Sequence, residues 1–167
     1  MPTISPCLWF NGAAEHAANC YVALFANSRV LSTSRYGPGM PFPAGTALMV
    51  EFELDGQRHQ ALNGGPNYTH SAAISLSISC KDAAEVDHYW YGLIANGGVE
   101  GRCGWLTDRF GVSWQVVPEG LGAVMTDSDP GRRARATAAM MGMTKLDLAA
   151  MRAAADAAGE TPIQTPR

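Results

Sequence analysis

Six residues of the chain carry side chains that suit the recognition of a small, partly polar molecule. One is aromatic, one is cationic, and the other four offer neutral amides or hydroxyls. Ligand pockets typically combine apolar surface with a few such polar groups. The cation, Arg58, can pair with a carboxylate or a phosphate. We expect a ligand-binding surface built from Trp9, Arg58, Gln60, Ser75, Ser77 and Gln115, and the sequence identifies no catalytic residue.

The spacing of these residues places them on one kind of surface. Successive side chains of a β-strand point to opposite faces of a sheet. If Ile74, Leu76 and Ile78 pack under a helix, then Ser75 and Ser77 face the other way. We expect the same alternation in other strands to complete a concave funnel with Cys7, Trp9, Arg58, Gln60, Leu62, Ser113 and Gln115.

The cysteines and histidines offer weaker candidates. The four cysteines have no C-x-x-C spacing and are too few for a disulfide scaffold in a chain of 167 residues, so we expect mostly buried thiols in a reducing compartment. The sequence leaves open whether Cys103 is reactive. We expect His59 to be a strand histidine with a local hydrogen bond, and His16, His70 and His88 form no evident cluster.

Two stretches of the chain show the same order of predicted elements. The first begins with a strand-like run at 4–10 and continues into a stretch at 11–25 whose apolar residues have helical spacing. It ends with alternating apolar residues at 48–54, directly before an Asp55-Gly56 turn that is typical of a hairpin.

The second stretch repeats this order. Apolar residues and serines alternate over 74–79, and the helix that follows has Val86, Tyr89, Trp90 and Leu93 on one stripe. Asp82 with Glu85 predicts the start of this helix, and Asn96-Gly97-Gly98 its end. Strands are predicted on both sides of a turn at 108–111, where Asp108 and Arg109 are expected to form a surface ion pair. Trp90, Trp105 and Trp114 are expected in the core or at interfaces.

The repeat predicts the fold class and the domain organisation. We expect an α+β fold in which paired βαβββ modules, at about 4–63 and 72–118, form one domain over 1–120. The modules would build a curved, mainly antiparallel sheet with helices on its convex side. An alanine- and methionine-rich helical extension is predicted over 121–160, followed by a flexible tail at 161–167.

The extension is predicted to hold two helices separated by Gly142. Asp129-Pro130 and Thr144 with Asp147 are expected to start them. Methionines offer a soft apolar surface, which we expect to be buried on the open side of the sheet or on a twofold partner. These methionines are Met140, Met141, Met143 and Met151.

Composition excludes several classes of partner. The net charge is −3, and charges of both signs are interspersed, so no basic surface for nucleic acid is expected. The basic run of Arg132, Arg133 and Arg135, which Asp127 and Asp129 precede, is predicted to be a solvated helix face. No apolar stretch is long enough to span a bilayer, and the first residues do not resemble a signal peptide. We therefore expect a cytoplasmic protein without nucleic-acid or membrane partners.

Four ordered motifs add a family resemblance. They are Pro6-Cys7-Leu8-Trp9-Phe10-Asn11-Gly12, Ala61-Leu62-Asn63-Gly64-Gly65-Pro66, Cys103-Gly104-Trp105-Leu106-Thr107-Asp108-Arg109-Phe110-Gly111-Val112-Ser113-Trp114-Gln115 and Val117-Pro118. With the paired modules, they resemble the PhnB-like branch of the vicinal oxygen chelate superfamily, the glyoxalase and bleomycin-resistance fold. Members of this branch are often labelled demethylubiquinone methyltransferases. The resemblance covers about 4–155 and implies a homodimer.

The resemblance also locates the positions where metal-using members of the superfamily hold their ion. Matching by motif puts these positions at Ser5, Gln60, Ala73 and Gln115. Alanine cannot coordinate, serine is a poor ligand, and neutral amides leave the charge of a divalent ion uncompensated. We therefore expect no metal and no other cofactor. We also expect no methyl transfer, because Gly64-Gly65 and Gly97-Gly98 lack the strand-to-helix context of a nucleotide-binding loop.

The sequence thus favours a metal-free, homodimeric protein that binds an unidentified small molecule. Two alternatives stay open. One is a metal-dependent lyase, isomerase or dioxygenase of the same superfamily, in which a metal would stabilise an enolate or a related anion. The other is a cofactor-free interaction or regulatory subunit whose funnel is filled by protein. Whether the chain is an enzyme is left open.

Overall fold

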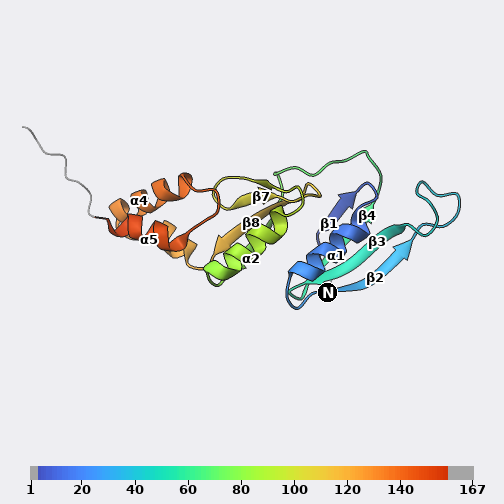
Figure 1. Ribbon diagram of the computed structural model, residues 1–167, viewed down its shortest axis with the longest axis horizontal. Helices are drawn as coiled ribbons and strands as arrows, with labels where there is room; N and C mark the ends of the chain where they lie inside the picture. The colour runs from blue at the N-terminus through green and yellow to red at the C-terminus, as the bar shows by residue number, and fades with distance from the viewer. Residues whose placement is uncertain (1–3, 158–167) are drawn as a thin grey trace, which may run out of the picture. The chain divides into compact units, whose positions relative to one another are not determined.

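The computed structural model describes residues 4–157, which form two compact units (Figure 1). The first unit ends at Ala72 and includes Phe110–Val112, and the second covers Ala73–Arg109 and continues from Ser113. Each unit holds one β-α-β-β-β succession, which confirms the α+β class with paired modules. The tail predicted at 161–167 lies outside the described residues.

The first unit is a four-stranded sheet with one helix. Its strand order is β1-β4-β3-β2; β1 runs parallel to β4, and the other neighbours are antiparallel. The elements are β1 (Cys7–Phe10), α1 (Ala14–Leu24), β2 (Arg29–Arg35), β3 (Ala47–Leu54) and β4 (Gln57–Asn63).

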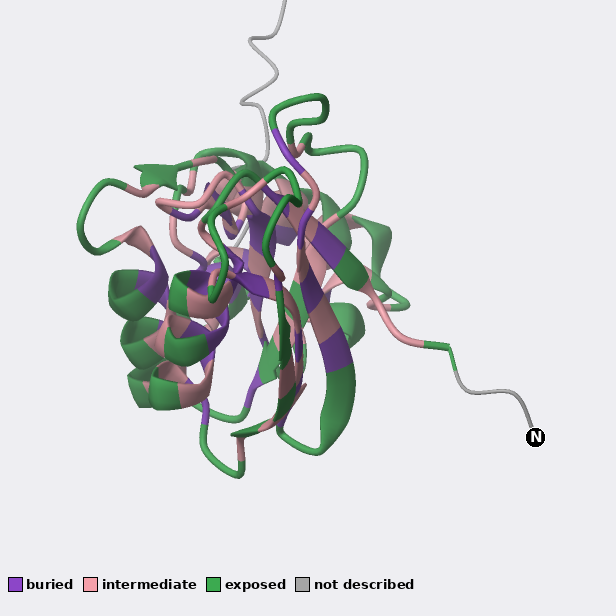
Figure 2. Ribbon diagram, turned by 90° about the vertical axis from the view of Figure 1, so that its right-hand side faces the viewer, coloured by how far each residue is buried: buried purple, intermediate pink, exposed green. Residues whose placement is uncertain are grey.

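Apolar periodicity explains how α1 covers this sheet. Ala14, Ala17, Ala18 and Tyr21 recur at helical spacing and are all buried. The Tyr21 ring lies 6.3 Å from that of Phe52 on β3, so α1 packs on the face to which Phe52 points. Along the strands, buried segments alternate with partly exposed ones (Figure 2).

The turn of the β3–β4 hairpin is the one that the sequence predicts. Asp55 and Gly56 have φ angles of 46° and 78°, the left-handed backbone that a tight hairpin turn requires. This hairpin therefore has a local cause, and it fixes the register of β3 on β4.

Asn63 joins the end of β4 to the start of α1. Its Oδ1 accepts a hydrogen bond of 3.0 Å from the Ala14 amide, and its Nδ2 donates to the Ala47 carbonyl at 2.9 Å. The Tyr36 hydroxyl donates to the Asn63 carbonyl at 2.5 Å. Asn63 is fully buried, and the N-cap residue of α1, Ala13, contributes no side-chain hydrogen bond. A residue 49 positions away in sequence therefore caps α1.

The second unit repeats the topology and adds helices. Its strand order is β5-β8-β7-β6, again with one parallel pair, β5 with β8. The elements are β5 (Leu76–Cys80), α2 (Ala83–Ile94), β6 (Val99–Glu100), β7 (Trp105–Thr107), β8 (Ser113–Pro118), α3 (Leu121–Met125), α4 (Pro130–Met141) and α5 (Leu148–Asp156).

Local signals start and stop α2 as predicted. The Asp82 carboxylate accepts a hydrogen bond from the Glu85 amide at 2.9 Å, and Asn96 has a φ of 61° just after the helix. The buried stripe of Val86, Trp90 and Leu93 faces the sheet.

Two predictions for this unit and one for the cysteines of both units are wrong. Ile74 is 71% exposed, because β5 pairs with β8 only from Leu76 onward. Asp108 is not at the surface: it is 5% exposed and accepts a 2.8 Å hydrogen bond from the indole of the buried Trp114. The expectation of mostly buried thiols also fails across the chain, since only Cys80 is buried, whereas Cys7 is exposed and Cys20 and Cys103 are intermediate.

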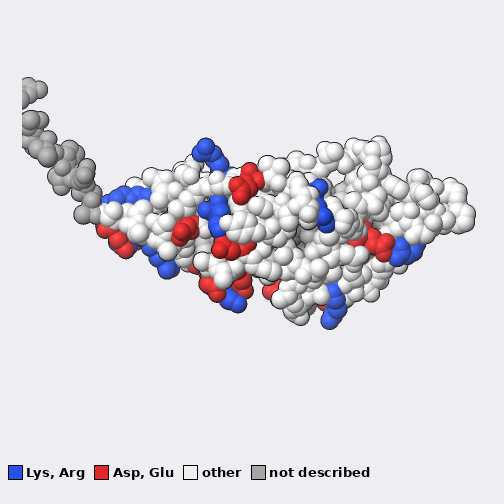
Figure 3. Space-filling model, viewed as in Figure 1, with Lys and Arg blue, Asp and Glu red and all other residues white. Residues whose placement is uncertain are grey.

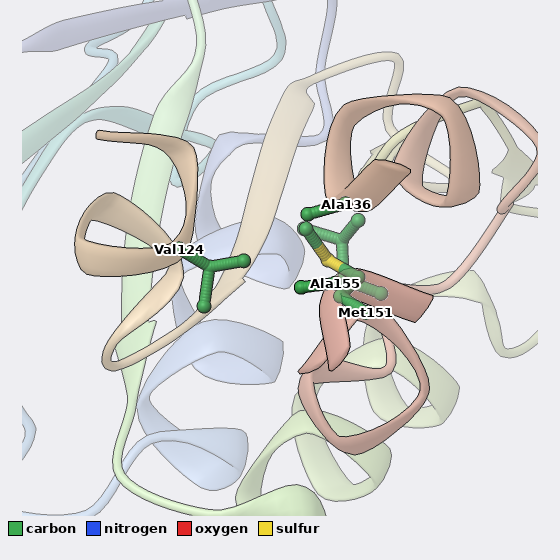
Figure 4. Packing of buried hydrophobic residues seen from close by; sticks show 5 residues of the cluster. Val124, Ala136, Met151 and Ala155 are labelled. Atoms are coloured by element: carbon green, nitrogen blue, oxygen red, sulfur yellow. The ribbon is translucent and has the colours of Figure 1, made fainter. Parts of the chain in front are cut away.

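The C-terminal helices form a small core of their own. Asp129 caps α4 by accepting a hydrogen bond from the Gly131 amide, as predicted. Asp147 caps α5 by accepting one from the Ala150 amide; of the predicted pair Thr144 and Asp147, Asp147 is the cap. Met151 is fully buried inside this cluster of helices, whereas Met141 is 56% exposed. Figure 4 shows buried side chains of this cluster, which come from α3, α4, α5 and the loop before α5; they are Val124, Ala136, Leu146, Met151 and Ala155.

The basic run on α4 is only in part the solvated face that the sequence predicts, because Arg133 is exposed whereas Arg132 and Arg135 have partners on α5. Arg132 forms ion pairs with Asp127, at 2.9 Å, and with Asp156. Arg135 donates to the carbonyls of Ala154 and Ala155 in the last turn of α5. Cations near the C-terminus of a helix satisfy carbonyls that have no partner within the helix. These arginines therefore bind α4 to α5.

Among the described residues, the surface shows no large region of a single charge on the face that Figure 3 presents. Blue and red atoms are interspersed over the face in Figure 3. Between residues 4 and 157, no helix has the length and apolar character needed to cross a membrane.

Candidate ligand-binding faces of the two sheets

The strand registers define one surface in the first unit, which we call face A. Phe52, which contacts α1, pairs with the buried His59, so their neighbours point away from the helix. Cys7 pairs with Gln60 and Trp9 with Leu62, so the side chains of Cys7 and Trp9 lie on the same face of the sheet as those of Gln60 and Leu62. Face A consists of Cys7, Trp9, Met49, Glu51, Glu53, Arg58, Gln60 and Leu62.

Trp9 lies at one end of face A and is held on several sides. Its indole nitrogen donates to the Gly65 carbonyl at 2.8 Å, and the Tyr68 ring meets it edge-on at 5.0 Å. A Cβ at Gly64 would lie 2.2 Å from the Trp9 ring, so only glycine fits there. The ring is half-buried, which leaves part of it for a ligand.

Arg58 is exposed and lies beside a carboxylate. Its Nε is 3.9 Å from Glu53, and the same carboxylate receives Arg29 at 2.8 Å. Glu53 therefore has two guanidinium groups near it, and part of the Arg58 charge is already balanced. This arrangement weakens the expected pairing of Arg58 with a ligand carboxylate or phosphate.

Sequence reasoning missed Glu51. It pairs with Gln60 across β3 and β4 and is half-buried on face A. The Ser32 hydroxyl donates to its Oε2 at 2.9 Å and the Gln60 amide to its Oε1 at 3.4 Å. The signal was present: if Val50, Phe52 and Leu54 face the core, the intervening Glu51 and Glu53 must face the other way.

The second unit presents a smaller polar surface, which we call face B. Leu76 and Ile78 pair with the buried Trp114 and Val116, so Ser77 and Gln115 point to the opposite face. The Gln115 amide donates to the Ser75 hydroxyl at 2.8 Å. Ser75, Ser77 and Gln115 therefore lie together. Ligand binding by the six residues expected from the sequence stays a prediction.

His59 lies on the helix-facing side of its sheet and does not reach face A. It is 7% exposed, its Nδ1 lies 2.9 Å from the Gln57 carbonyl, and its ring stacks on Phe52 at 5.4 Å. This arrangement confirms the strand histidine with a local hydrogen bond. Burial lowers the pKa of His59, against a smaller opposing effect of the Gln57 carbonyl.

Cys80, which ends β5, is an unreactive thiol. Burial, helped by the nearby carboxylates of Glu85, Asp82 and Glu119, raises its pKa to about 11. A thiol needs its thiolate form to act as a nucleophile or a metal ligand, so Cys80 is protonated and inert at neutral pH.

The residues that the family resemblance puts at the four metal positions carry donors that do not suit a divalent ion. Gln60 and Gln115 carry neutral amides, which donate to Glu51 and Ser75, and Ser5 and Ala73 add at most one hydroxyl. Within residues 4–157, no group of three or more histidine, cysteine, aspartate or glutamate side chains is placed to hold a metal.

A groove of about 390 Å³ lies elsewhere in the second unit, where α2 and α5 begin. Its lysines are already paired: Lys81 lies 3.0 Å from Glu85, and Lys145 forms an ion pair with Asp87. Glu119 and Arg152 line the same groove.

The fold defines the class of protein. Two βαβββ units, each with strand order first-fourth-third-second, make up the glyoxalase and bleomycin-resistance fold of the vicinal oxygen chelate superfamily. Within that class, the chain belongs to a particular family: a sequence model described as 3-demethylubiquinone-9 3-methyltransferase matches residues 2–117.

Solved structures agree with this assignment. The chain is similar to the PhnB protein from Bacillus cereus, with 32% identity and a TM-score of 0.65 over 70% of this chain and 99% of that one. Protein PA1353 from Pseudomonas aeruginosa is 24% identical, with a TM-score of 0.59 over 71% and 98% of the two chains. The fosfomycin resistance protein FosX from Listeria monocytogenes, complexed with Mn(II) and sulfate, shares the fold at 10% identity and a TM-score of 0.52, over 77% and 98%. No curated protein sequence matches the chain.

Proposed function

We propose that this protein binds a small organic molecule, without a metal ion, on the sheet faces that point away from α1 and α2. The contacts expected on face A are Trp9, Arg58 and Gln60, and those expected on face B are Ser75, Ser77 and Gln115. The observation that carries the proposal is the state of the two glutamines. They occupy positions that hold metal ligands in related enzymes, and their amides donate to Glu51 and Ser75.

Face A supports the organic ligand. It combines the half-buried Trp9, the apolar Leu62 and Met49, and hydrogen-bonding groups on Gln60 and Glu51. Apolar surface with a few fixed polar groups is the usual composition of a site for a small molecule.

We also propose that methyl transfer is not the activity, despite the family description. The glycines that a methyl-donor loop would need have structural roles. Gly64 makes room for Trp9, and a Cβ at Gly98 would lie 2.5 Å from the Cα of Ile94. The Asn63-Gly64-Gly65 motif follows β4 and does not join a strand to a helix. The side-chain oxygen of Asn63 already accepts a hydrogen bond from the first residue of α1.

The family resemblance further supports a homodimer, which we include in the proposal. Native mass spectrometry tests assembly and ligand together, on protein purified without chelator and without added metal. We expect a dimer that carries a small organic adduct and no transition metal. A dimer that carries one or two transition-metal ions, and that loses a lyase, isomerase or dioxygenase activity when a chelator removes them, would overturn the proposal in favour of an enzyme of that kind. A protein with neither adduct nor metal, and with no binding in a screen of small organic molecules, would overturn it in favour of an interaction subunit.

Matched variants test the proposed surface. Gln60→Leu and Gln115→Leu remove the two amides, and we expect each to weaken binding of the adduct by about tenfold. Gln57→Leu is the control, because Gln57 is exposed at the hairpin end of the same strand as Gln60. If all three variants bind the adduct as the wild type does, the ligand does not occupy these faces.

A further inference from the structure

We propose that face A selects organic cations, such as primary amines, and that the Glu51 carboxylate anchors them. This inference rests on the proposed function, since it names the class of molecule that the same surface takes. It reverses the polarity expected from Arg58, which pointed to an anionic ligand.

The two glutamates of face A have opposite surroundings. Glu53 lies 2.8 Å from Arg29 and 3.9 Å from Arg58, so cations of the chain already balance its charge. Glu51 receives only neutral donors, the Ser32 hydroxyl and the Gln60 amide. Within the described part of the chain, no lysine, arginine or histidine forms an ion pair with Glu51. Glu51 therefore presents a negative charge that a bound cation can neutralise.

The neutral donors fix the Glu51 carboxylate in place. Each carboxylate oxygen accepts one hydrogen bond, and a carboxylate oxygen has room for a second donor. Because the side chain is half-buried, its charge is screened less than that of a fully exposed carboxylate. A ligand ammonium group can therefore add a charge-assisted hydrogen bond without displacing Ser32 or Gln60.

The rest of face A suits the organic part of such a ligand. Glu51 pairs with Gln60, Gln60 pairs with Cys7, and Trp9 follows two residues along β1. Two strand spacings and two residues along a strand separate the Cα atoms of Glu51 and Trp9 by about 12 Å. Leu62 and Met49, which pair with each other, lie on the same face. A small molecule with an ammonium group at one end and an apolar group at the other spans this surface.

A series of probes that differ only in charge tests the inference. Benzylamine, benzyl alcohol and benzoate carry the same ring with a cationic, a neutral and an anionic group at neutral pH. Their dissociation constants are measured by ligand-observed NMR titration of the wild-type protein at low salt. We expect benzylamine to bind about tenfold more tightly than benzyl alcohol, and benzoate to bind more weakly than both.

Two isosteric variants assign the preference to one carboxylate. Glu51→Gln keeps the acceptor for Ser32 and removes the charge, and we expect it to reduce the preference for benzylamine to about twofold or less. Glu53→Gln also removes one charge but leaves Arg29 and Arg58 without their carboxylate, so we expect it to weaken benzylamine binding less than Glu51→Gln does and to keep a clear preference over benzyl alcohol. Glu51→Asp keeps the charge and should retain a measurable preference. A thermal melt of each variant checks that it is folded.

The outcomes separate this inference from the proposed function. If benzoate or benzyl alcohol binds at least as well as benzylamine, or if Glu51→Gln keeps the full preference, the cation inference is wrong, although a small-molecule site still exists. If none of the three probes binds, the inference also fails. The mass-spectrometric search for an adduct then decides the proposed function separately.

Discussion

The two βαβββ units hold their helices by different means. In the second unit, Asp82 caps α2 by accepting a hydrogen bond from the amide of Glu85, three residues further along the chain. In the first unit, the residue that accepts from the start of α1 is Asn63, at the far end of the last strand. The same topology is thus stabilised once by a local contact and once by a long-range one. Losing the local cap should loosen one helix, whereas losing the Asn63 side chain should loosen a helix and two strands together.

The units also differ in what surrounds their sheets. The strands of the first unit are long, with seven residues in β2, eight in β3 and seven in β4. In the second unit, β6 has two residues and β7 has three, and the unit adds the helical core around Met151. The family match ends at residue 117, so this core belongs to the extension. The first unit therefore depends on its sheet, and the second divides its apolar contacts between a sheet and a helical cluster.

The largest effect is expected at Asn63. Asn63→Ala leaves the Ala14 amide and the Ala47 carbonyl without these hydrogen bonds in a buried site, and we expect a loss of about 4 kcal/mol in the free energy of unfolding by urea. Asn63→Asp keeps the acceptor for the Ala14 amide but sets a carboxylate against the Ala47 carbonyl in a fully buried site, so it should also be destabilising. Asn19→Ala, at an exposed position of α1, is the control and should change little. A loss at Asn63 no larger than that at Asp82 would contradict the comparison.

The extension core should be nearly as sensitive. Met151→Ala creates a cavity among α3, α4 and α5, and we expect a loss of about 3 kcal/mol. Hydrogen exchange should show the loss of protection in α4 and α5, while the amides of α1 stay protected. Met141→Ala is the matched control, because Met141 is mostly exposed. Equal losses of protection in α1 and α5 would mean that the two units do not open separately.

A smaller effect is expected at the local cap. Asp82→Ala removes the hydrogen bond to the Glu85 amide and should cost about 1 kcal/mol in urea unfolding. Asp82→Asn should restore most of this stability, since asparagine is also a good N-cap. If the asparagine variant is as unstable as the alanine variant, the role of Asp82 is not that of a helix cap.

The smallest effect is a pH dependence in the first unit. Burial lowers the pKa of His59 below its ordinary value of 6.5, so between the folded and unfolded pKa values the unfolded chain binds more protons. The free energy of unfolding should therefore fall as the pH decreases below 6.5. His59→Gln should flatten this part of the profile, whereas His88→Gln, at an exposed position of α2, should leave it in place. An unchanged slope in His59→Gln would assign the effect to other groups.

Local patterns in the sequence predicted much of the fold. Alternation over Leu48–Leu54 and the Asp55-Gly56 turn gave the β3–β4 hairpin, and Asp82 and Asp129 marked helix starts. Strand β2 offers no such pattern, because most of its residues are exposed and its apolar residues do not alternate. Glu51 follows from the same alternation as Phe52, because alternate residues of β3 face away from α1.

The sequence by itself determined the features that have local causes. These are the β3–β4 hairpin, the helix caps at Asp82 and Asp129, and the alternation of side chains along each strand, which sets the composition of face A. Tertiary structure alone decided the partners of the buried and charged groups. Asn63 caps α1 although it lies 49 positions away in the sequence. The Trp114 indole donates to the carboxylate of Asp108, and the Arg135 guanidinium donates to the last carbonyls of α5. It also decided that Glu53 has cationic partners and Glu51 neutral ones. A hydrogen bond or ion pair depends on distances of a few ångströms, and only folding brings such distant residues that close.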